Sequence, residues 1–67
     1  MTSDLDIWRS ALLLVTQHGD DAVFVACGRI DKMIERGDPA GEGTWKRVLA
    51  AVRELRRANR EVGERLH

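Results

Sequence analysis

The fold is decided by residues 38–55, which read DPAGEGTWKRVLAAVREL. Asp38 followed by Pro39 is typical of a helix start, because aspartate accepts hydrogen bonds from the first amides and proline fits the first helical position. Two glycines weaken the first turns, so a later start at Thr44 stays open. The apolar residues that follow are spaced three or four apart, which predicts a helix with one buried face: Trp45, Val48, Leu49, Val52 and Leu55.

A helix is also predicted over residues 4–18. Ser3 precedes it as a candidate N-cap, and Gly19 follows it as a stop. The helical spacing of the apolar residues predicts a buried stripe, which three further residues extend or widen: Trp8, Ala11, Leu12 and Val15, then Leu5, Ile7 and Leu14.

The remaining helix is predicted over residues 21–36, with Asp20 as its N-cap and Gly37 as its end. Gly28 lies in its middle, and we expect it to make room for a bulky neighbour such as a tryptophan. Valine and isoleucine are abundant here, but a long run without a turn signal favours a helix over a strand. The predicted buried face is Val23, Ala26, Cys27, Ile30, Met33 and Ile34.

The predicted fold is all-α, a single domain of 67 residues formed by a small three-helix bundle. The third helix is the longest, beginning at residue 39 or 44 and reaching residue 57 or further. Residues 58–67 either extend this helix or are disordered. Short connections favour antiparallel neighbours, so we expect the third helix to pack against a hairpin of the first two. Burial and chain entropy nearly cancel in so small a domain, so its stability is marginal.

The sequence predicts a cytoplasmic protein that does not cross a membrane. Cys27 is the only cysteine, which excludes an internal disulfide and fits a reducing compartment. Asp4 and Asp6 lie where a secretory signal would be basic. The apolar run at residues 11–15 is far too short to span a bilayer.

Four segments carry a resemblance to known proteins: DIWR at 6–9, HGDDA at 18–22, GD at 37–38 and TWKRVLAAV at 44–52. Together they resemble a family of short alpha-proteobacterial proteins that share a domain of unknown function, over residues 5–57. The resemblance implies a bacterial, cytoplasmic, single-domain protein. It implies no activity, substrate or cofactor.

No complete catalytic, metal or cofactor motif is present, so we expect no enzyme activity, no metal and no cofactor. His18 and Cys27 are too few for a transition-metal site, which needs about four converging ligands. Cys27 on an apolar helix face is more typical of a buried small residue than of a nucleophile activated by His18. The glycine-rich residues 37–46 lack the Gly-Lys-Ser/Thr of a phosphate loop and are expected to form a connecting loop.

The apolar residues fall into core candidates and interface candidates. Trp8 and Trp45 lie within apolar stripes and are expected in the core. Leu13, Phe24 and Val25 point away from the predicted buried faces, and a joined patch of such residues would mark an interface. Whether these three join is left open by the sequence.

Charge is divided unevenly along a chain that is neutral overall. Residues 1–43 carry eight acids and four bases, a net charge of −4, and residues 44–67 carry seven bases and three acids, a net charge of +4. A basic strip on the third helix could contact phosphates, or could be a solvated face, or could pair with an acidic protein surface such as this chain's own first half. Its residues are Lys46, Arg53, Arg57 and Arg60, bordered by Arg56.

The tail continues a heptad spacing. Trp45, Val48, Val52 and Leu55 are followed by Asn59, Val62 and Leu66 at alternating steps of three and four residues. Such a seam predicts pairing with a second copy, in which a seam asparagine fixes the register. Gly63 opposes the pairing, and a disordered tail is the alternative.

These features predict a non-enzymatic protein-protein interaction or regulatory module that binds an unidentified protein and self-associates as a homodimer. The predicted interface residues are Leu13, Phe24, Val25, Asn59, Val62 and Leu66. The alternative function is accessory nucleic-acid binding through the basic strip.

Overall fold

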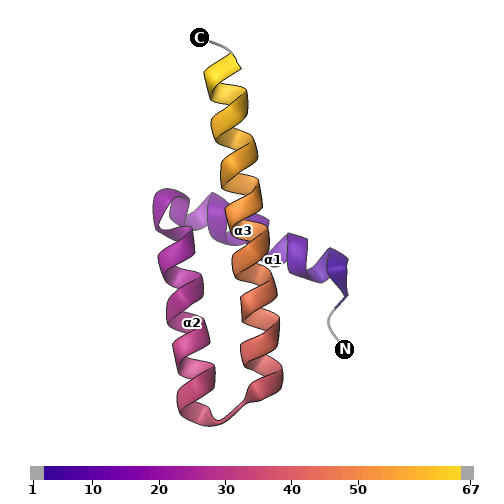
Figure 1. The fold of residues 1–67 in the computed structure, drawn as a ribbon, viewed down its shortest axis with the longest axis vertical. Coiled ribbons are helices and arrows are strands. Elements are labelled where there is room, and N and C mark those ends of the chain that lie inside the picture. The colour runs from indigo at the N-terminus through magenta and orange to yellow at the C-terminus, as the bar shows by residue number, and fades with distance from the viewer. Residues whose placement is uncertain (1–2, 66–67) are drawn as a thin grey trace.

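The computed structural model describes residues 3–65, with side chains described as far as Arg60. The described chain is helical almost throughout and contains no strand, so the all-α prediction is confirmed for this part of the protein. Four elements follow one another along the described chain, of which Figure 1 labels α1, α2 and α3. They are α1 (Asp4–His18), the 3-10 turn η1 (Gly19–Asp21), α2 (Ala22–Arg36) and α3 (Pro39–Arg65).

The turn between α2 and α3 follows directly from its residues. Gly37 has a φ of 67°, and its amide and that of Asp38 donate to the last carbonyls of α2. The Asp38 carboxylate accepts a hydrogen bond of 2.9 Å from the Gly41 amide, so α3 begins at Pro39 and not at Thr44. Residues 39–46 are therefore helical, and the connecting loop expected over residues 37–46 shrinks to residues 37 and 38.

The junction between α1 and α2 differs from the prediction. The predicted N-cap Asp20 lies inside η1, and α2 begins at Ala22 after Asp21, whose side chain makes no capping bond. The chain therefore leaves helical geometry at Gly19, where φ is 54° and ψ is −121°, and enters α2 through a tighter helical turn. The Ser3 hydroxyl, by contrast, accepts the Asp6 amide at 3.2 Å, as predicted for the start of α1.

The hairpin of this fold is formed by α2 and α3, not by α1 and α2. These two helices run antiparallel, and α1 passes behind α3 to reach the start of α2 (Figure 1). α1 packs mainly against α3 and less against α2. The tight turn leaves no room for a side chain at residue 41. A Cβ on Gly41 would lie 2.6 Å from Met33 Sδ and 2.6 Å from Asp38 Oδ2.

The core lies where α1 crosses the hairpin, and it is built from small side chains. Alanine and valine dominate the buried set, which lets the helix backbones approach closely. Among residues 3–60, the buried ones are Ile7, Ala11 and Leu14 of α1, Ala22, Ala26 and Ile30 of α2, and Val48, Ala51 and Val52 of α3. Trp45 is half-buried beside this core, with the Arg29 guanidinium 5.8 Å from its ring centroid.

Several residues predicted to be buried are exposed. On α1 the inner face is taken by Ile7, Ala11 and Leu14, so Leu5, Trp8 and Leu12 turn outward. On α2 the predicted core residue Ile34 is 55% exposed. Gly28 makes room for no tryptophan, because no described atom lies within 4 Å of a Cβ built there.

α3 extends well beyond the elements that it packs against. Its 27 residues correspond to about 40 Å of helix, and the molecule measures 46 × 22 × 16 Å. Residues 57–60 are exposed, and the helix continues to Arg65. The extension rises above α1 and α2 at the top of Figure 1.

Candidate protein-protein interface

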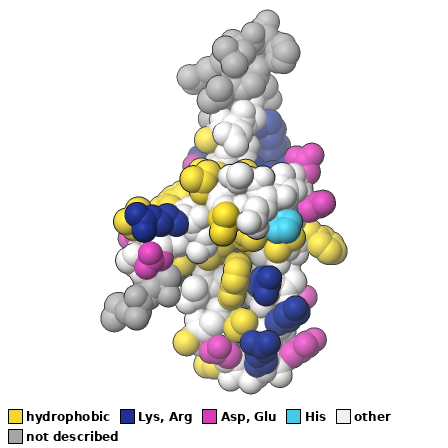
Figure 2. Space-filling model, turned by 180° about the vertical axis from the view of Figure 1, so that it is seen from behind, with side chains coloured by type: hydrophobic (Ala, Val, Ile, Leu, Met, Phe, Trp, Pro, Cys, Tyr) yellow, Lys and Arg dark blue, Asp and Glu magenta, His cyan; other side chains and the backbone are white. Residues whose placement is uncertain are grey.

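The outer face of α1 carries an apolar stripe that no described element covers. Leu5 is 59% exposed, Trp8 43% and Leu12 57%. At 3.6 residues per turn these three side chains lie within about 60° of one another. Hydrophobic side chains form a band across the middle of the molecule in Figure 2, the view from behind in which α1 faces the reader. We call Leu5, Trp8 and Leu12 the α1 stripe.

One edge of the α1 stripe carries charge. Arg9 and Asp6 are both exposed, and neither side chain forms an ion pair with a described residue. Leu13, a predicted interface residue, lies on the same edge and is 55% exposed. Tryptophan, leucine and arginine on one exposed helical face are typical of protein interfaces.

The other predicted apolar contacts divide between surface and core. Phe24 on α2 is 81% exposed, the highest value of any large hydrophobic residue described. Val25, predicted to be exposed beside it, is instead half-buried and packs against the core. Because Val25 packs against the core, the three predicted residues do not form one exposed patch.

The basic strip of α3 is largely engaged within the chain. Lys46 pairs with Glu42 one turn earlier at 2.6 Å, and Arg57 pairs with Glu54. Arg56 reaches another element, where Nη2 lies 2.9 Å from Asp20 Oδ1 and Nη1 lies 3.2 Å from the Asp20 carbonyl oxygen. Only Arg53 and Arg60 of the strip form no ion pair with a described residue.

Two ion pairs join the acidic and basic halves of the chain. Arg56 pairs with Asp20 of η1, directly after α1, and Arg47 pairs with Asp4 at the start of α1. Both ends of α1 are therefore tied to α3 by opposite charges, although exposed pairs of this kind stabilise a fold only slightly. The uneven charge along the sequence is the signal for these contacts. Of the three possibilities left open for the basic strip, pairing with the chain's own acidic first half occurs at its bordering residue Arg56.

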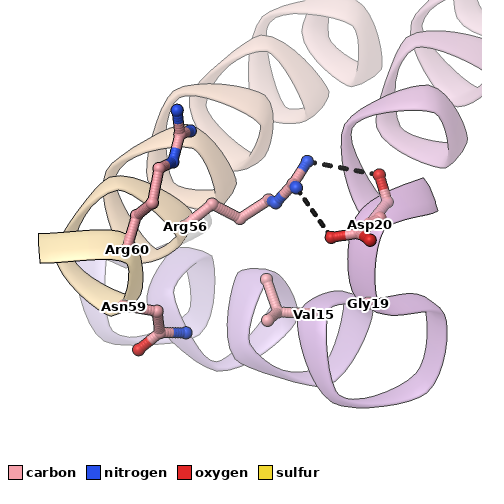
Figure 3. A pocket seen from close by; sticks show the side chains of 6 residues that line it. All are labelled: Val15, Gly19, Asp20, Arg56, Asn59 and Arg60. Atoms are coloured by element: carbon pink, nitrogen blue, oxygen red, sulfur yellow. Dashed lines mark hydrogen bonds and ion pairs between the residues drawn. The ribbon is translucent and has the colours of Figure 1, made fainter. Parts of the chain in front are cut away.

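An open hollow of about 350 Å³ lies where α1, η1 and α3 meet. It is lined by Val15, Gly19, Asp20, Arg56, Asn59 and Arg60. Figure 3 shows Arg56 reaching across to Asp20 while Asn59 and Arg60 project to either side. The ion pair thus occupies the middle of the hollow and leaves Arg60 as its accessible cation.

The predicted tail seam is described only in part. Asn59 is exposed and lies at the rim of the hollow. Val62 and Leu66 lie outside the residues whose side chains are described.

No metal-ligating cluster of three or more His, Cys, Asp or Glu side chains exists among the described residues. Cys27 has a free thiol and is half-buried, and His18 lies exposed at the end of α1.

Within the described part of the chain, no helix has the length and apolarity needed to cross a bilayer. Comparisons with protein families, curated proteins and solved structures find no match for this chain.

Proposed function

We propose that this protein is a non-enzymatic protein-protein interaction module that acts in the bacterial cytoplasm and self-associates. The single observation that carries the proposal is the α1 stripe. Large apolar side chains on one exposed face of a small protein mark a surface that another protein covers. The resemblance to short alpha-proteobacterial proteins and the free thiol of Cys27 support the proposed location.

In this proposal the helices act as one small bundle whose binding surfaces lie outside the shared core. The α1 stripe is the main contact, and Phe24 supplies a second apolar contact on α2. The tail seam of Asn59, Val62 and Leu66 is a further proposed contact, since helical backbone continues through most of it.

A photo-crosslinking amino acid placed at Leu12 in the living bacterium tests whether the α1 face meets protein. The matched control places the same amino acid at Glu35, an exposed position on α2. We expect defined adducts from position 12 and none from position 35. Equal labelling at both positions, or none at either, contradicts an interaction role for this face.

The alternative is nucleic-acid binding by the basic strip, and Arg53 and Arg60 favour it as exposed cations without described ion-pair partners. Retention on DNA or RNA that falls steeply with salt would support it, because phosphate contacts release counterions. Exchange of both arginines for glutamine would then abolish the retention. We expect weak retention, because Lys46, Arg56 and Arg57 already pair with acids.

A further inference from the structure

The α1 stripe has one leucine on each side of its centre, at equal distances along the helix. Leu5 and Leu12 flank a central pair of Trp8 and Arg9, in the order Leu-x-x-Trp-Arg-x-x-Leu. All four side chains are exposed and fall within about 100° of the helix circumference. About a two-fold axis through this centre, the leucine at one end of the stripe would face the leucine at the other end of a second copy, as a patch that complements itself requires.

From this pattern we infer that α1 of one copy pairs antiparallel with α1 of a second copy, stripe against stripe. The inference rests on the proposed function and names its partner as a second copy of this chain. Leu5 packs against Leu12 of the second copy, and the two Trp8 rings meet beside the two-fold axis. The antiparallel direction also opposes the two helix dipoles, whereas a parallel pair would bring both acidic N-termini together.

The charges along the stripe's edge complement one another in this arrangement. Each copy contributes one anion, Asp6, and one cation, Arg9, neither of which pairs with a described residue. The two-fold axis brings two of each sign to the same edge of the contact. That edge therefore has no net charge and forms a polar rim beside the leucines.

The stripe itself is small, since its three large apolar side chains are 43–59% exposed. We therefore expect a weak, reversible contact between the two copies.

The test measures the mass of the purified full chain by sedimentation equilibrium, for the wild type and two matched variants. Leu12→Glu places a charge in the stripe, and Ile34→Glu makes the same kind of change on α2 at nearly equal exposure, 57% against 55%. We expect the wild type to reach twice 7.6 kDa below about 0.5 mM. Leu12→Glu should raise the dimer dissociation constant at least tenfold, about 1.4 kcal/mol or more, and Ile34→Glu should leave it unchanged.

A second measurement decides the geometry without any substitution. In a mixture of ¹³C-labelled and unlabelled protein, the antiparallel pairing predicts intermolecular NOEs between the methyl groups of Leu5 and Leu12. A dimer that lacks these NOEs and ignores Leu12→Glu overturns the α1 pairing but leaves the interaction role standing. A chain that stays monomeric at about 0.5 mM overturns the pairing itself. Photo-crosslinked adducts formed through residue 12 in the bacterium would then come from a different protein.

Discussion

At the scale of single residues, replacing glycine by alanine is expected to change the stability in opposite directions at two positions. Gly28 lies mid-helix with no described atom within 4 Å of an added Cβ, so Gly28→Ala should stabilise the protein by about 1 kcal/mol. Gly19 has a φ of 54°, where a side chain is strained, so Gly19→Ala should destabilise it by about 1 kcal/mol. Urea unfolding followed by circular dichroism measures both. A loss of stability in Gly28→Ala would mean that a neighbour occupies the space beside it.

Replacing either tryptophan is expected to have a different effect, because Trp45 packs against the core and Trp8 lies on the surface. Trp45 packs against the core and carries Arg29 over its ring, so Trp45→Ala should cost about 3 kcal/mol of unfolding free energy. Trp8 is 43% exposed, so Trp8→Ala should cost about 1 kcal/mol and chiefly weaken self-association. Thermal melts at low concentration and sedimentation at high concentration separate the two effects. Equal losses of stability would show that Trp8 belongs to the core after all.

At the scale of elements, helix ends could be predicted from sequence and helix faces only in part. Ser3 and Asp38 cap their own helices through contacts three residues away, so local sequence carries that information. On α1, two apolar stripes have the same period, one through Ile7 and one through Trp8. Which stripe turns inward depends on how α1 crosses α3, and periodicity does not encode that crossing. The candidate interface was missed for this reason, since its residues were assigned to the core.

The Asp38 cap allows a direct test of how α3 begins. Asp38→Ala removes the acceptor of the Gly41 amide and should destabilise the protein by about 1 kcal/mol. Asp38→Asn retains an acceptor oxygen and should recover most of that loss. Urea unfolding measures both variants, and hydrogen exchange reports whether the amides of Gly41 and Glu42 lose protection. Unchanged protection in Asp38→Ala would mean that α3 does not depend on this cap.

At the scale of the whole molecule, the long α3 separates two routes to a dimer. The tail seam begins at Asn59 on the extension of α3, whereas the α1 stripe lies on an exposed face of α1. Deleting residues 59–67 removes the seam but keeps the last core residue, Val52, and the Arg56–Asp20 pair. If α1 pairs with α1, the truncated chain should dimerise with a dissociation constant within about threefold of the wild type, measured by sedimentation equilibrium. A rise of more than about tenfold would place the contact in the tail, where a heptad seam buries its apolar residues only against another helix.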